Sequence, residues 1–130
     1  MAFPLEATMT ETMTKIAWIA LALIHATPAL AVFAPQTVAR LYGVPPDGDL
    51  GVLLVHRGAL FLAIVVGCLW AAVDGSARRV TSVLVTISVV GFLIVYWRSG
   101  APVGPLRKIA LVDAVALAPL AFVLVRAWRI

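Results

Sequence analysis

Four apolar stretches, each about as long as a bilayer is thick, dominate this sequence. They cover residues 16–33, 51–73, 80–97 and 109–125, and short segments rich in Gly, Pro and charged residues separate them. A helix rises about 1.5 Å per residue and the hydrocarbon core is about 30 Å thick. Strands are unfavourable here because an open strand in lipid leaves backbone groups unpaired. We therefore expect an all-α fold, an antiparallel up-and-down integral membrane four-helix bundle that forms a single domain over residues 1–130.

The composition supports this expectation and argues against nucleic acid as a partner. Hydrophobic residues make up 63% of the chain and charged residues 12%, whereas soluble domains are about half apolar and a quarter charged. The net charge of +4 does not form a basic patch, because the cations occur singly or in pairs at the ends of apolar stretches. Such positions anchor spans at lipid head groups. The one cysteine, Cys68, lies inside an apolar stretch, and we expect it to be a packing residue.

Basic and aromatic residues define the two expected membrane faces. One face would carry Lys15, Arg78, Arg79, Arg126 and Arg129, and the other Arg40, Arg98, Arg107 and Lys108. Because cytoplasmic loops are enriched in Lys and Arg, this distribution favours cytoplasmic termini in a multi-pass protein of the bacterial inner (plasma) membrane. Aromatic belts are expected from Trp18, Trp70 and Trp128 on the first face and from Tyr96 and Trp97 on the second.

The connecting segments lead to further expectations. Residues 1–14 are interpreted as a short polar lead. Lys15, the apolar residues after it and the small residues at 29–31 also fit a signal peptide, but we expect this stretch to be retained as the first span. Residues 36–42 are predicted to form a short interfacial helix within the loop 34–50. Pro28 and Pro119, inside the first and last spans, are predicted to kink their helices.

Four ionisable residues lie within the apolar stretches, where an unpaired charge is costly: His25, His56, Arg57 and Asp113. Counted along each span from the face with the two long loops, they fall roughly 7–12 Å deep. They would therefore form one polar layer, with Arg98 at its rim and Arg40 and Tyr42 in the loop above. Arg57 and Asp113 are predicted to pair, which would lower the cost of burying both.

Small residues recur every fourth position along the second stretch, at Ala59, Ala63, Gly67 and Ala71. Such a stripe allows close helix packing, and we expect it to pack within the chain rather than against a second copy. His56 lies on the same side of the helix and is therefore predicted to face protein. Arg57, about 100° further around, would face a different neighbour.

The polar layer supports several hypotheses for function. In the first, His25, His56, Arg57, Arg98 and Asp113 bind a small amphipathic molecule such as a lipid or quinone. In the second, the charges only lock the helices together in an accessory or assembly subunit of a membrane complex. A third hypothesis is a small dimeric transporter. Whether the protein is an enzyme stays open. The sequence has no phosphate-binding loop, C-x-x-C pair or metal-ligand spacing, so we predict no metal and no cofactor. The predicted partners are membrane lipids, the amphipathic ligand, and a second copy or a membrane-complex subunit.

Several short patterns resemble a family of small, uncharacterised bacterial four-helix inner-membrane proteins. They are Leu23-Ile24-His25 with Pro28, Leu41-Tyr42-Gly43-Val44, His56-Arg57-Gly58-Ala59-Leu60-Phe61 and Asp113-Ala114-Val115-Ala116-Leu117. The architecture is also similar to the DoxX-like group. Some family members are labelled phosphopantetheine adenylyltransferase, but this chain has neither the His-x-Gly-His motif of that activity nor room for its α/β domain. The resemblance therefore implies a fold and a set of shared polar residues rather than an activity.

Overall fold

Residues 3–129, which the computed structural model describes, form an all-α protein. The α-helices are α1 (Pro4–Ala29), α2 (Thr37–Tyr42), α3 (Gly48–Val73), α4 (Arg78–Arg98) and α5 (Pro105–Trp128), and two short 3-10 helices, η1 (Leu30–Val32) and η2 (Gly75–Ala77), complete the order. The four longer helices are long and apolar enough to cross a membrane, which suggests a multi-pass membrane protein. The predicted fold class and number of spans are confirmed.

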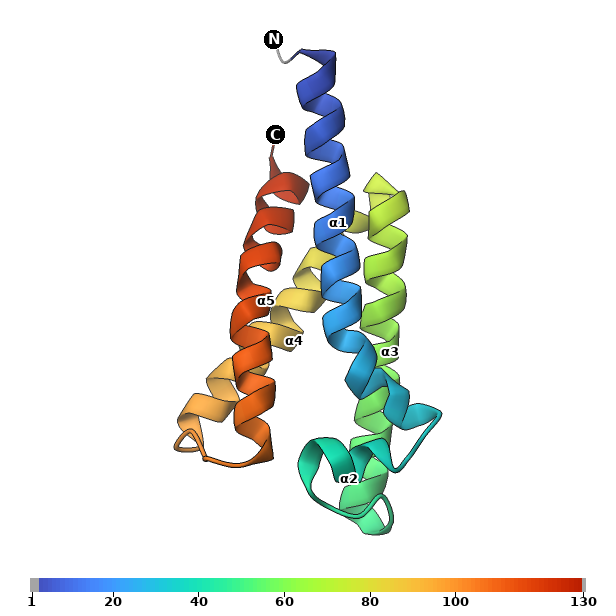
Figure 1. Ribbon diagram of the computed structural model, residues 1–130, viewed down its shortest axis with the longest axis vertical. Helices are drawn as coiled ribbons and strands as arrows, with labels where there is room; N and C mark the ends of the chain where they lie inside the picture. The colour runs from blue at the N-terminus through green and yellow to red at the C-terminus, as the bar shows by residue number, and fades with distance from the viewer. Residues whose placement is uncertain (1–2, 130) are drawn as a thin grey trace.

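The four long helices pack antiparallel, with both termini at one end of the bundle (Figure 1). α1 packs closely along α3 and also contacts α5, and α4 packs along α5. α3 and α4 contact each other much less, and they diverge toward the end that carries α2 (Figure 1). We call this the loop end, and the opposite one the terminal end.

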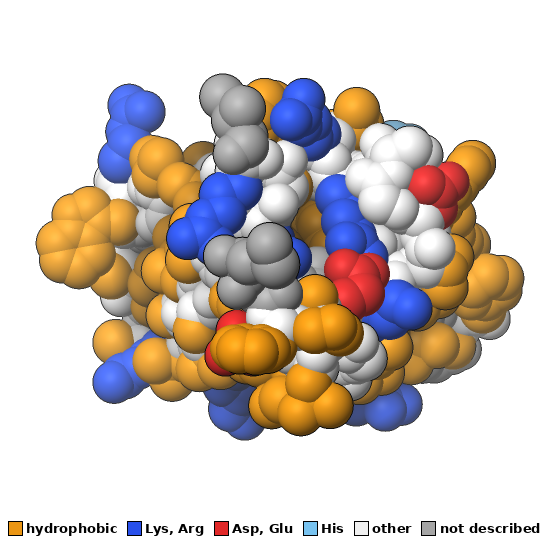
Figure 2. Space-filling view, turned by 90° about the horizontal axis from the view of Figure 1, so that it is seen from above, with side chains coloured by type: hydrophobic (Ala, Val, Ile, Leu, Met, Phe, Trp, Pro, Cys, Tyr) orange, Lys and Arg blue, Asp and Glu red, His pale blue; other side chains and the backbone are white. Residues whose placement is uncertain are grey.

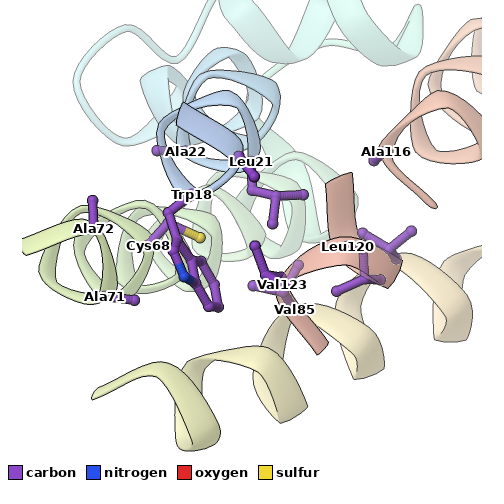
Figure 3. Packing of buried hydrophobic residues seen from close by; sticks show 12 residues of the cluster. Trp18, Leu21, Ala22, Cys68, Ala71, Ala72, Val85, Ala116, Leu120 and Val123 are labelled. Atoms are coloured by element: carbon purple, nitrogen blue, oxygen red, sulfur yellow. The ribbon is translucent and has the colours of Figure 1, made fainter. Parts of the chain in front are cut away.

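The core lies where the four long helices meet, nearer the terminal end. α3 contributes small side chains, including Cys68, which is buried as expected, so the large Trp18 of α1 fits against it (Figure 3). Trp18 is wholly buried, and its indole N–H has no partner among the described residues. The expectation that Trp18 belongs to an interfacial belt is therefore wrong. Trp70 and Trp128, which were predicted beside it, are exposed at the terminal end.

The first helix begins earlier than predicted. Residues from Pro4 onward belong to α1, so the expected polar lead is helical over that part, whereas Met1 and Ala2 lie outside the described residues. Pro4 suits the first turn because it has no N–H to leave unpaired. Four threonine hydroxyls donate to carbonyls one turn earlier over 2.8–3.0 Å: Thr8, Thr10, Thr12 and Thr14. This local bonding lets a threonine-rich segment remain helical.

The loop-end connections agree with the sequence pattern. The short helix predicted at 36–42 is present as α2, and Gly43 ends it with a φ of 69° that suits glycine. After Pro28 the first span tightens into η1. Pro119 lies inside α5. The kinks predicted at these two prolines stay predictions.

The small-residue stripe of α3 is only partly buried. Ala71 is buried and the methyl group of Thr81 from α4 approaches Gly67, but Ala59 and Ala63 are exposed. The expectation that the whole stripe packs within the chain is therefore wrong for its loop-end half. α3 instead approaches α1 through Gly58, where an added Cβ would lie 3.0 Å from the Pro28 carbonyl oxygen.

An ion pair that the sequence interpretation missed joins three helices at the terminal end. Both terminal nitrogens of Arg78, on α4, donate to the two carboxylate oxygens of Glu11 on α1. The Nε of Arg78 donates to the carbonyl of Ala71 on α3 over 2.9 Å. Arg78 was predicted only as a head-group anchor, and Glu11 was assigned to the polar lead.

Candidate functional site

Arg57 lies at the centre of an aromatic cluster near the loop end. Its guanidinium carbon is 5.0 Å from the ring centre of Phe61, 5.3 Å from that of Phe92 and 5.7 Å from that of Tyr42. These rings come from α3, α4 and α2, so the cation joins three elements. The rings attract a desolvated cation by about 0.5–2 kcal/mol each. We call these four residues the Arg57 cluster.

The hydrogen-bonding capacity of Arg57 is unused. A guanidinium has five N–H donors, yet none donates to any of the residues that the structure describes. The aromatic faces stabilise the positive charge, but they do not accept a directional hydrogen bond from each N–H group. The donors are therefore available to a carbonyl, carboxylate or phosphate oxygen.

The predicted ion pair between Arg57 and Asp113 is not formed. Among residues 3–129 the one salt bridge within 4.0 Å is that of Arg78 with Glu11. Asp113, half-buried on α5, still shares an electrostatic environment with Arg57. Burial raises the pKa of the Tyr42 hydroxyl, Arg57 opposes this rise, and Asp113 adds to it. The aromatic rings replace the carboxylate as the immediate neighbours of the cation.

His25 is buried and has neighbours for both ring nitrogens. Nδ1 donates to the carbonyl of Leu21 over 2.8 Å, and Nε2 lies 3.5 Å from the hydroxyl of Ser88 on α4. Because a carbonyl only accepts, Nδ1 carries the proton, and Nε2 is left to accept from the Ser88 hydroxyl. The ring also packs 5.7 Å from Phe61. Phe61 therefore links His25 to the Arg57 cluster.

Two of the predicted site residues lie apart from this cluster. His56 is exposed on the outer side of α3, so the expectation that it faces protein is wrong. The 100° turn between neighbouring residues brings Arg57 inward and leaves His56 outward. Arg98 is exposed in the last turn of α4 and makes no hydrogen bond, ion pair or cation–π contact with the described residues.

An apolar hollow lies between the loop-end parts of α4 and α5. Its volume is about 360 Å³, and its lining consists of Leu93, Tyr96, Trp97, Arg107, Ala110 and Leu111. The Tyr96 ring stacks on Phe92 of the Arg57 cluster with ring centres 6.1 Å apart. Ala110 precedes Asp113 by nearly one helical turn. The hollow, with Arg107 as its single cation, is thus linked to the cluster through the stacked rings of Tyr96 and Phe92.

The sequence contained signals for part of this arrangement that were not used. Phe61 follows Arg57 by four residues, the spacing at which side chains on a helix meet. Phe92 carried no such signal because it depends on how α4 crosses α3. No group of three or more His, Cys, Asp or Glu side chains within residues 3–129 is placed to hold a metal ion.

These features define a four-span helical membrane protein with a buried histidine, an aromatic-enclosed arginine and an Arg–Glu bridge at the opposite end. Comparisons with protein-family models, with curated proteins and with solved structures find no match.

Proposed function

We propose that this protein binds a small amphipathic molecule whose head group carries a carbonyl or anionic oxygen, such as a quinone or a fatty acid. The observation that carries the proposal is the set of unused N–H donors on the guanidinium of Arg57. In a site of low dielectric, a hydrogen bond from a charged donor contributes about 1.5–3 kcal/mol. A ligand oxygen at Arg57 would gain this free energy.

Each part of the ligand would have its own neighbours. Arg57 would hold the head-group oxygen, and the Tyr42 hydroxyl, which is protonated at neutral pH, can donate a second hydrogen bond. The apolar hollow beside Tyr96 would take part of the ring or tail, with Arg107 at its edge. Asp113 would orient a hydroxyl or protonated group of the ligand.

His25 has a positioning role in this proposal. Its bonds to Leu21 and Ser88 hold the imidazole between α1 and α4, and its packing on Phe61 supports the face that Arg57 covers. We place the protein in the inner membrane of a bacterium with cytoplasmic termini, on the charge distribution of the loops. The ligand would then enter from the non-cytoplasmic leaflet.

The test is a comparison of thermal unfolding in neutral detergent with ubiquinone-1 or oleate as the probe. We expect at least one probe to stabilise the wild type, and Arg57→Gln to weaken its apparent affinity about tenfold or more. Arg40→Gln is the matched control, because Arg40 is exposed at the same end and the charge change is identical. Arg57→Lys keeps the charge but loses the planar donor array. Its affinity for the probe is expected to lie between those of Arg57→Gln and Arg40→Gln.

The alternative function is that of an accessory subunit in which the same groups are structural. The fully partnered ring of His25 and the aromatic enclosure of Arg57 favour it. In that case Arg57→Gln lowers the unfolding temperature by the same amount with and without either probe, and neither probe stabilises the wild type. That result would exclude the binding proposal.

A further inference from the structure

The terminal end of the bundle has a basic hollow that is separate from the Arg57 cluster. Its volume is about 460 Å³, and it is lined by Gly75, Ser76, Arg78, Arg79, Arg126 and Ala127. These residues bring together η2, the first turn of α4 and the last turns of α5. None of the lining residues is acidic. Figure 2 looks onto this end, where Lys and Arg side chains gather around the middle.

The three arginines differ in what they can still bind. Arg78 already donates hydrogen bonds to the Glu11 carboxylate and to the Ala71 carbonyl. Arg79 donates through Nε to the Ala127 carbonyl over 3.1 Å, and its guanidinium lies 5.4 Å above the ring of Trp128. Its terminal nitrogens make no hydrogen bond to a described residue, so they can donate to a ligand.

Arg126 provides the most specific observation. Its Nε atom is buried, yet it has no hydrogen-bond partner among residues 3–129. A buried donor without an acceptor costs about 1–3 kcal/mol, and more when it is charged. The terminal nitrogens of the same guanidinium make no hydrogen bond to a described residue, and an anion bound to them would offset part of this cost. The helix start at η2 adds no free donor of this kind, because the Asp74 carboxylate accepts from the backbone N–H of Ser76.

The position of the hollow indicates which anion it suits. Trp70 and Trp128 are about half exposed at this end, at 59% and 51%, as expected for residues at the membrane surface. Val80 and Val125 present exposed apolar side chains just inside the same end. An anionic group bound here would lie at head-group level, with apolar helix surface beneath it.

From this geometry we infer that Arg79 and Arg126 bind a phosphate group at the terminal end. Phosphate oxygens would accept from the terminal nitrogens of Arg126 and Arg79, which line the hollow and donate to none of the described residues. Its source is either the head group of an anionic phospholipid, whose tails would lie along α4 and α5, or a free phosphate.

The experiment measures thermal unfolding of the purified protein in neutral detergent with three probes. These are phosphatidylglycerol, a diacylglycerol with the same tails, and inorganic phosphate at matched ionic strength. If phosphatidylglycerol is the one probe that stabilises the protein, the ligand is a lipid head group. If inorganic phosphate is the one probe that does so, the ligand is free phosphate. The proposal is overturned when neither stabilises the wild type, or when diacylglycerol stabilises it as much as phosphatidylglycerol does.

Matched variants separate a site from general charge attraction. Arg126→Gln is expected to weaken the effective probe about tenfold or more. Arg129→Gln removes one charge at the same end but outside the hollow, and is expected to leave the affinity within about twofold. Equal losses in the two variants would contradict the proposal. Ser76→Asp places a negative charge on an exposed lining residue, so it should weaken binding even if Arg126→Gln does not fold.

Discussion

At Arg57 the chain holds a cation at a depth where lipid hydrocarbon solvates it poorly. Three aromatic rings, with centres 5.0–5.7 Å from the guanidinium carbon, offset part of the cost of burying this charge. They leave its N–H donors free to form hydrogen bonds. The result is a charge that is stabilised but still able to form hydrogen bonds. Its neighbour Tyr42 belongs to α2, outside the four candidate spans, so its ionisation can be followed by changing the pH of the solution.

The raised pKa of Tyr42 predicts how stability depends on pH. In the unfolded chain a tyrosine ionises near pH 10. The folded protein holds its proton to higher pH, because burial raises the pKa of Tyr42. The contribution of Tyr42 is therefore complete below about pH 10 and is lost as pH rises through the folded-state pKa. Unfolding measured from pH 8 to 11 should show a smaller alkaline loss of stability in Tyr42→Phe than in wild type. Equal losses would contradict the prediction.

At the scale of helices, the contact of α1 with α3 depends on one glycine. An added Cβ at Gly58 would lie 3.0 Å from the carbonyl oxygen of Pro28 and 3.1 Å from the Cβ of Ala31. The first of these is a backbone atom that cannot rotate away. The two helices therefore approach closely because the Pro28 backbone of α1 faces Gly58 of α3, which has no side chain.

Substituting this glycine should separate the two helices. We expect Gly58→Ala to lower the free energy of unfolding by about 1–3 kcal/mol, the usual cost of overpacking. Gly91→Ala in α4 is the control, because nothing lies within 4 Å of its added Cβ. That variant should be neutral or up to about 1 kcal/mol more stable, since alanine favours helix. Similar losses in both variants would show that Gly58 has no special role. Chemical denaturation in detergent provides the measurement.

The helices could be predicted from the sequence because their lengths and ends depend on local patterns. Apolar length fixed the spans, and the short helix before Gly43 followed from the turn residues around it. Which neighbour each polar group meets depends on how the helices cross, so the Arg57–Asp113 pair and the inward position of His56 were wrong. The ring of Phe92 over Arg57 and the Glu11–Arg78 bridge join residues distant in sequence, and no local pattern encodes them.

At the scale of the whole molecule, polar contacts hold the helices together at the terminal end, whereas the helices lie further apart at the loop end. Arg78 connects α1, α3 and α4 through Glu11 and Ala71. At the loop end, α2 and the Arg57 cluster provide the connection between the diverging helices. This asymmetry leaves the two hollows at opposite ends of the bundle, one basic and one mainly apolar.

Removing the ion pair between Glu11 and Arg78 should destabilise the bundle moderately. Glu11 is 42% exposed in its side chain, so solvent screens the pair, although both carboxylate oxygens are bonded. We expect Glu11→Gln to lower the unfolding free energy by about 0.5–1 kcal/mol at low salt, with less effect at high salt. Glu6→Gln on the same helix is the control, since Glu6 makes no ion pair within the described residues. A loss that does not change with salt would argue against an electrostatic role.

We predict the orientation of the whole molecule from where its cations lie. At the terminal end, Arg78 and Arg79 begin α4 directly after the short connection through η2, and cations this close to a short connection count most in the positive-inside rule. The connections at the other end are longer. The termini should therefore face the cytoplasm. In a Cys68→Ala background, a membrane-impermeant maleimide added to intact bacterial cells should label Val103→Cys, at an 81% exposed position. Ser76→Cys, exposed at the opposite end, should react only after the cells are permeabilised. The reverse pattern would invert the topology and would move the entry of the proposed amphipathic ligand to the cytoplasmic leaflet.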